Sequence, residues 1–184
     1  IFPSIGAAWL ISSEDFMSNV SLVDQLKLRA SIGLTGNDGI GNYVAESYFT
    51  SRRFLEGTGI VSGNLANSQI QWEKTTKFNV GIDLGLLDER IALTFDFFNN
   101  TTDKLLNVKT VNPLFGYYSY LNNDGKLKNT GIELGLNGRI VNGTDFKWDI
   151  GANLSTYKNK ILSLPGGTDE FTIEGVNATI INKE

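Results

Sequence analysis

Four carboxylates are the side chains best suited to acid–base chemistry, and each falls on the polar side of an alternating run: Asp83, Asp96, Glu133 and Asp149. Two carboxyl groups held close together can act as general acid and base, as in glycoside hydrolysis. The chain has no histidine and no cysteine, which removes the commonest general base and excludes disulfides and thiolate metal sites. We therefore predict a solvated polar surface, with no catalytic residue, metal site, cofactor or enzymatic activity.

Two glycine-rich segments share only composition with ligand-binding loops. Residues 33–41 lack the Lys-Ser/Thr pair that makes a phosphate loop specific. Residues 122–125 read Asn-Asn-Asp-Gly, but they lack the spacing and the distal glutamate of a calcium loop. Both segments are typical of turns, which these residue types commonly form.

An aromatic cluster, Tyr117, Tyr118 and Tyr120, lies in a predicted loop. Aromatic rings in such a loop could stack on sugars or peptides, or contact a partner that covers the loop. The same rings could equally form a membrane-interface belt or pack within the loop. The sequence leaves these alternatives open.

The charge balance limits the class of partner. The chain carries 16 basic and 20 acidic residues, a net charge of −4, which argues against nucleic acid. No apolar run reaches the length of about 18 residues that a transmembrane helix needs, but membrane-spanning strands leave a weaker, alternating signal. The chain begins Ile1-Phe2-Pro3 with no signal peptide, so we expect an internal piece of a longer protein.

The elements that must position these residues are β-strands. The strongest signal comes from two alternating runs that flank the polar segment 87–90. Strict alternation predicts strands with one apolar face, here joined as a hairpin. Leu86 then opposes Ile91, and Gly81 lies beside Asp96 on the polar face. A slip of one residue would turn every apolar side chain to the wrong face, so this register should be fixed.

The other strands follow the same alternating pattern, at residues 5–11, 26–34, 132–140 and 146–154. We predict an all-β, antiparallel up-and-down sheet of about six long strands.

Connections of different length join these strands. We predict one helical turn in segment 12–24, capped by Ser12 or Ser13. We predict long irregular loops at residues 36–71 and 107–126. Short turns then fall at one end of the strands and long loops at the other.

The last hairpin turns at Asn142-Gly143, and the simplest register through it places Gly138 opposite Trp148.

Strand length distinguishes two interpretations of this pattern. Runs of about 10 residues match the roughly 25 Å apolar band of an outer-membrane barrel, whereas strands of soluble proteins average about 5–6 residues. We favour a transmembrane barrel segment over a soluble extracellular β-sandwich that binds carbohydrate. An open sheet edge is not viable in lipid, so further strands must complete the barrel.

The barrel interpretation assigns one face of the sheet to lipid and the other to the lumen. The lipid-facing residues are Leu28, Ile32, Val80, Ile82, Leu84, Leu93, Phe95, Phe97, Leu134, Leu136, Ile150 and Leu154. The lumen-facing residues are Asn79, Asp83, Asp96, Glu133, Asp149 and Asn153.

Five stretches in order resemble a family, the SusC/RagA-type TonB-dependent transporters of Bacteroidota. The main one is 71–85, which contains Trp-Glu-Lys-Thr followed by the Asn, Gly and Asp of an alternating strand. The others are 2–9, 26–37, 129–134 and 146–153.

The resemblance implies that residues 1–184 are part of a single β-barrel domain, from the plugged class of about 22 strands. It implies a multi-pass protein of the bacterial outer membrane that imports oligosaccharides or peptides. Its partners would be a SusD-like surface lipoprotein acting as a lid, the TonB complex, the glycan or peptide cargo and outer-membrane lipid. This chain shows no plug domain, no TonB-contacting segment and no terminal barrel strand.

Overall fold

The computed structural model describes residues 1–163, 170–173 and 176–179, and the chain divides into two compact units. The first unit comprises residues 1–35, 76–101 and 128–160. The second comprises residues 36–75, 102–127 and 161–184.

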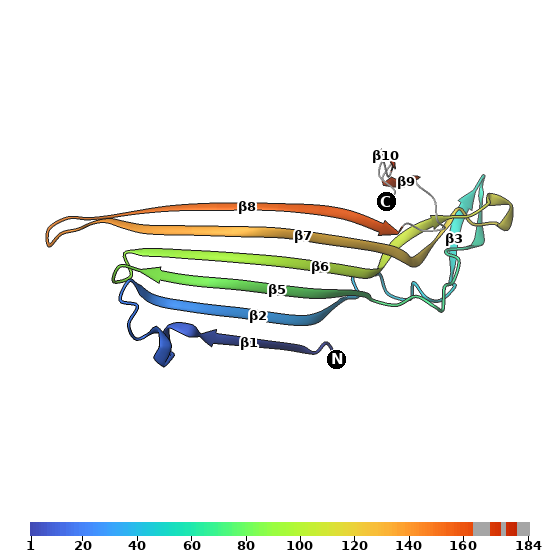
Figure 1. The fold of residues 1–184 in the computed structure, drawn as a ribbon. Coiled ribbons are helices and arrows are strands. Elements are labelled where there is room, and N and C mark those ends of the chain that lie inside the picture. The colour runs from blue at the N-terminus through green and yellow to red at the C-terminus, as the bar shows by residue number, and fades with distance from the viewer. Residues whose placement is uncertain (164–169, 174–175, 180–184) are drawn as a thin grey trace. The chain divides into compact units, whose positions relative to one another are not determined.

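Figure 1 shows the main sheet, whose six strands lie in the order β1-β2-β5-β6-β7-β8. Except where β2 is followed by β5, neighbours in this sheet are also neighbours along the chain, as an up-and-down arrangement requires. The strands are β1 (Ser4–Leu10), β2 (Val23–Asn37), β5 (Glu73–Leu86), β6 (Ile91–Thr110), β7 (Ser119–Asn142) and β8 (Lys147–Ser163). Four of these strands have 15 or more residues, which suits a membrane-spanning wall better than a soluble sheet.

The β1–β2 ladder shows how alternation fixes the register. The strands are antiparallel, with Ile5 opposite Ile32 and Trp9 opposite Leu28. These pairs put large apolar side chains on one face, where cross-strand contacts stabilise the ladder. On the other face Ser4 lies opposite Gly33 and Ala8 opposite Arg29, so that face carries small and charged side chains.

The apolar face lacks the burial that a sandwich would give it. Among the residues that the structure describes, no hydrophobic side chain is buried. Ile82, Phe95 and Leu134 remain 37%, 36% and 40% exposed, and Val80 is half-buried. A β-sandwich covers one face of each sheet with the other, so these exposures argue against the soluble alternative.

The β5–β6 turn occupies the four positions expected, between Leu86 and Ile91. Leu87, Asp88 and Glu89 all have positive φ, between 56° and 59°. Positive φ at the two central residues matches the right-handed twist of a hairpin, although glycine or asparagine usually supplies it.

Contacts with β2 and with the residue just before it hold this turn in place. The Asp24 carboxylate accepts from the Glu89 N–H at 3.0 Å, and Leu22 O accepts from the Leu87 N–H at 3.3 Å.

The β7–β8 register differs from the simplest one. The turn occupies residues 143–146 and is closed by the Gly143 N–H bonding to Phe146 O at 2.9 Å. A Cβ on Gly138 would therefore meet Ile150, and Trp148 is not its neighbour. The prediction was wrong because the turn is longer than the Asn142-Gly143 pair alone.

Two of the predicted connections were also wrong. Strands β6 and β7 are longer than expected, so the connection between them covers 111–118 instead of 107–126, and it includes the 3-10 turn η3 (Pro113–Phe115). Segment 11–22 holds two 3-10 turns, η1 (Ile11–Ser13) and η2 (Asp15–Met17). Their N-caps are Leu10 and Glu14, without side-chain capping bonds, so neither Ser12 nor Ser13 caps a turn.

The 36–71 region is not irregular throughout. It contains an antiparallel hairpin of β3 (Phe49–Phe54) and β4 (Gly57–Ser62), in which Phe49 lies opposite Ser62. The alternating pattern did not predict these strands, because they are short and carry Arg52 and Arg53 at adjacent positions. In the same unit β9 (Glu170–Ile173) pairs with β10 (Val176–Thr179).

The helical segments of the described chain are the three short 3-10 turns, and none is long and apolar enough to cross a membrane.

Candidate functional site

Three charged side chains from three adjacent strands meet on the polar face of the first unit. The Arg29 guanidinium on β2 donates to both carboxylate oxygens of Asp83 on β5, each at 2.8 Å. It also donates to the Asp96 carboxylate on β6 at 3.2 Å. The fork of a guanidinium suits such bidentate pairing, so one arginine links two carboxylates that would otherwise repel each other.

Glycine makes room for this cluster. A Cβ on Gly81 would clash with the Asp96 carboxylate and the Arg29 guanidinium, which confirms that Gly81 lies beside Asp96. The same relation recurs on β7, where Phe98 lies over Gly131 and Thr94 over Gly135. Larger side chains of one strand thus lie across glycines of the next, and the polar face is a tightly fitted layer.

A second polar group lies near the short turns of the first unit. The Arg139 side chain on β7 donates to the Asp149 carboxylate on β8 at 2.8 Å. Arg90 donates to the backbone oxygens of Arg139 and Ile140 at 3.4 and 3.3 Å. An open recess of about 290 Å³ is bordered by Arg90, Arg139 and Asp149, and its lining also includes Glu89.

The structure brings together only some of the residues predicted to face the lumen. Asp83 and Asp96 share Arg29, and Asp149 pairs with Arg139. Asn153 approaches the position of Gly135. Asn79 and Glu133 are exposed. Because an arginine binds both Asp83 and Asp96, this pair lacks the free base that hydrolysis would need.

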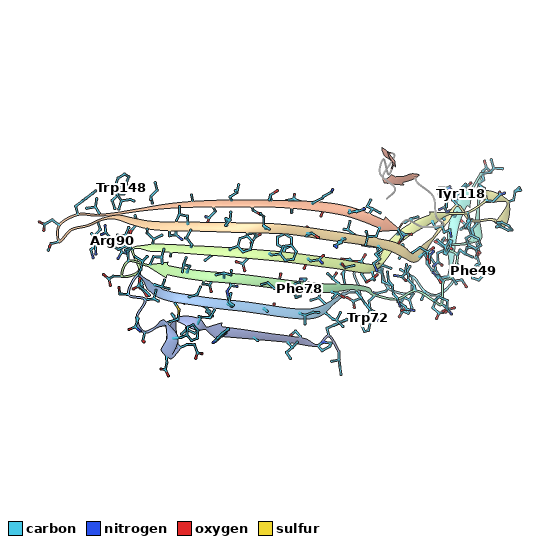
Figure 2. All side chains as sticks on the ribbon, in the orientation of Figure 1. Phe49, Trp72, Phe78, Arg90, Tyr118 and Trp148 are labelled. Atoms are coloured by element: carbon cyan, nitrogen blue, oxygen red, sulfur yellow. The ribbon has the colours of Figure 1, made fainter. Side chains whose placement is uncertain are left out.

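The residues predicted to face lipid keep much of their surface uncovered. Seven of them are exposed, namely Ile32, Ile82, Phe95, Leu134, Leu136, Ile150 and Leu154. The other five are half-buried, namely Leu28, Val80, Leu84, Leu93 and Phe97. Figure 2 shows the side chains along the strands, with Phe78 on β5 and Trp148 on β8 labelled.

The tyrosine cluster lies where β7 begins. Tyr120 is in β7 and Tyr117 precedes it, and both are half-buried. Tyr118 is 79% exposed (Figure 2), and its backbone oxygen accepts from the Val111 N–H at 3.0 Å. Of the three rings, Tyr118 is the most accessible to a ligand or partner.

Sequence reasoning missed Arg29. The available signal was its position on the polar face of β2, next to β5, which carries Asp83 on the same face. It also missed an amide network in the second unit around Gln71, Lys104 and Asn123, which joins residues too far apart in the sequence for any periodic signal.

Comparisons with known proteins agree with this geometry. Residues 1–179 match the family model described as TonB dependent receptor-like, beta-barrel. The chain is 34% identical over 174 residues to TonB-dependent receptor P3 of Formosa agariphila, which covers 92% of this chain and 17% of that protein. It is 33% identical over 177 residues to TonB-dependent receptor SusC of Bacteroides thetaiotaomicron, which covers 91% of this chain and 18% of that protein.

Solved structures give the same result. The structure of the RagAB peptide transporter superposes with a TM-score of 0.84 at 29% identity, covering 94% of this chain and 19% of that chain. The closed-closed state of the RagAB peptide importer gives a TM-score of 0.85 at 28% identity, covering 97% of this chain and 20% of that chain.

These relatives are outer-membrane β-barrels, which confirms the predicted fold class and location. The chain spans about a fifth or less of the length of the proteins it matches, and its six-stranded sheet is correspondingly an open segment of a barrel. The chain therefore belongs to the TonB-dependent receptor family, as a segment of its β-barrel.

Proposed function

We propose that residues 1–184 form part of the wall of a single β-barrel domain in an importer of oligosaccharides or peptides. The observation that carries this proposal is the combination of long alternating strands with an apolar face that nothing buries in the described residues. The relatives include SusC and a peptide transporter. The wall acts passively, by separating lipid from an aqueous path, and it performs no enzymatic reaction.

In this proposal the two faces meet different media. The apolar set, which includes Ile82 and Phe95, stands in hydrocarbon. The polar set, which includes Asp83 and Asp96, lines the lumen, where a hydrated ion cluster costs far less than it would in lipid. Trp9, Phe146 and Trp148, each at least half exposed, form an aromatic belt at the membrane interface near the short turns.

The proposal includes the partners that the resemblance to SusC and RagA implies. A SusD-like lipoprotein covers the barrel as a lid, and the TonB complex supplies energy through other parts of the protein. Tyr117, Tyr118 and Tyr120 contact the cargo or the lid, with Tyr118 the main candidate because of its exposure.

Labels on two neighbouring residues of β7 test which face of the sheet meets lipid. This chain has no cysteine, so a bimane label can be attached at Leu134→Cys or at Glu133→Cys in the full-length protein, with any cysteine elsewhere replaced. Both positions are exposed. In brominated lipid we expect strong quenching at position 134 and little at 133. Equal quenching at both, or the reverse order, would contradict the assigned faces.

Uptake tests the importer role. A strain that lacks the full-length protein should lose uptake of at least one labelled oligosaccharide or peptide from a defined panel. Wild-type protein should restore that uptake only while TonB is active. Unchanged uptake of every compound in the panel would contradict the proposal.

A further inference from the structure

In the second unit, the segment that leads into β5 is bound by side-chain amides. We call residues 67–72 the strap. The Asn67 side chain donates to Leu121 O at 2.8 Å. The Gln71 N–H donates to the Asn123 side-chain oxygen at 2.7 Å, and the Asn123 amide nitrogen donates back to Gln71 O at 2.7 Å. Asn123 thus pairs with the backbone of residue 71 much as a neighbouring strand would.

This pairing crosses an intervening strand. In the sheet, β6 separates β5 from β7, yet the strap runs directly into β5 and binds Leu121 and Asn123 on β7. The strap therefore reaches past β6 to β7 at this level. The Asn123 amide nitrogen also donates to Lys104 O on β6 at 2.9 Å, so a single asparagine side chain joins the strap, β6 and β7.

The crossing coincides with an unusual backbone position. Lys104, in the middle of β6, has a φ of 59°, and its ammonium group bonds to the Gln71 side-chain oxygen. Just beyond it, the Leu106 N–H donates to the Glu73 carboxylate at 3.0 Å. A left-handed conformation is unfavourable for a non-glycine residue and persists only where surrounding contacts over-determine it.

The strap carries the longest connection in the chain, residues 38–72. Asn64 closes the base of the β3–β4 hairpin by accepting from the Tyr48 N–H at 3.2 Å and donating to Glu46 O at 2.9 Å. Beyond this base the hairpin exposes Phe49 and Ile60. Aromatic and arginine side chains commonly carry much of the binding energy at an interface, and holding such groups rigid lowers the entropy cost of binding.

We propose that Asn123 is a positioning residue that holds the strap across β6 and so keeps the 38–72 connection in one arrangement before a ligand or partner arrives. The role in uptake rests on the importer function proposed above. The pairing of Asn123 with Gln71 does not depend on it.

Amide exchange in the full-length protein tests the pairing. Asn123→Leu removes the acceptor of the Gln71 N–H, so that amide should exchange at least about tenfold faster, as expected for the loss of a hydrogen bond. Asn123→Asp keeps an acceptor and should retain most of the protection. Asn122→Ala is the matched control, because that side chain bonds to Asp124 and to the Asn123 backbone N–H and not to the strap. Continued protection of Gln71 in a correctly assembled Asn123→Leu protein would overturn the proposal.

Uptake kinetics test the positioning role. Asn123→Leu should raise the half-saturating cargo concentration by about threefold or more, since binding must now order the connection, while the maximal rate and heat-modifiability stay near wild type. Faster Gln71 exchange with an unchanged half-saturating concentration would reject the role in recognition. If wild-type protein imports nothing, the importer proposal fails, and the exchange result still decides whether Asn123 holds the strap.

Discussion

The two units of this chain are ordered by different means. In the first unit, alternation along β2, β5 and β6 sends apolar and polar side chains to opposite faces, and the register follows from that pattern. In the second unit, individual amides bind backbone groups instead. Asn64 and Asn123 bind backbone oxygens of the 38–72 connection, and Asn67, within that connection, binds Leu121 O on β7. A sheet whose register is fixed by alternation tolerates many substitutions that keep the alternation. A connection held by a few side-chain amides depends on each of those amides.

The largest expected effect comes from breaking the alternation itself. Ile82→Arg places a guanidinium on the apolar face of β5 and should destabilise the assembled full-length barrel by about 2–4 kcal/mol, the usual cost at the bilayer midplane. Asn79→Arg puts the same side chain on the opposite face of the same strand and should assemble normally. Heat-modifiability on gels measures both, and equal loss in the two variants would refute the two-face pattern.

Filling a glycine position should have the next largest effect. Gly81→Val must displace Asp96 and Arg29 and should cost about 1–3 kcal/mol, as overpacking usually does. Gly138→Ala is the control, because its Cβ would meet only Ile150 and Ile140 at ordinary distances of 3.8 and 3.9 Å. Denaturant midpoints of the refolded full-length protein should separate the two, and a similar midpoint for both would show that the polar layer is not tightly fitted.

Removing the shared cation should cost less. Arg29→Gln leaves Asp83 and Asp96 facing each other without a guanidinium, but the cluster is partly exposed, so we expect about 1 kcal/mol. Adding Asp83→Asn should recover part of that loss, since the repulsion disappears. The four denaturant midpoints of this double-mutant cycle measure the coupling, and simple additivity would mean that the ion cluster contributes nothing as a unit.

The smallest effect concerns the left-handed turn after β5. Glu89→Gly keeps the backbone N–H that bonds to Asp24 and suits the positive φ of this position, so stability should rise by about 0.5–1 kcal/mol. Gly116, with a φ of 81°, provides the reverse test, because Gly116→Ala should lower stability by a similar amount. A loss of stability in Glu89→Gly would show that its side chain matters more than its backbone.

Much of the first unit could be predicted because its information is local. The hairpin around residues 87–90, the neighbourhood of Gly81 and Asp96, and the apolar set of β1 and β2 all follow from period-two alternation. The true ends of β6 and β7 did not follow, because both strands continue through asparagine- and lysine-rich sequence that shows no alternation. The extra residues of the β7–β8 turn likewise left no signal in composition.

The sequence by itself determined that this protein is a sheet with one apolar face, and it carried enough family-specific spacing to suggest a barrel of the TonB-dependent class. Only the tertiary structure decided that Arg29 would join Asp83 and Asp96, and that Asn123 would bind a segment on the far side of β6. Alternation fixes which face a side chain occupies, because successive residues of a strand point to opposite sides. It does not fix which distant side chain lies next to it, since that depends on the order and stagger of whole strands.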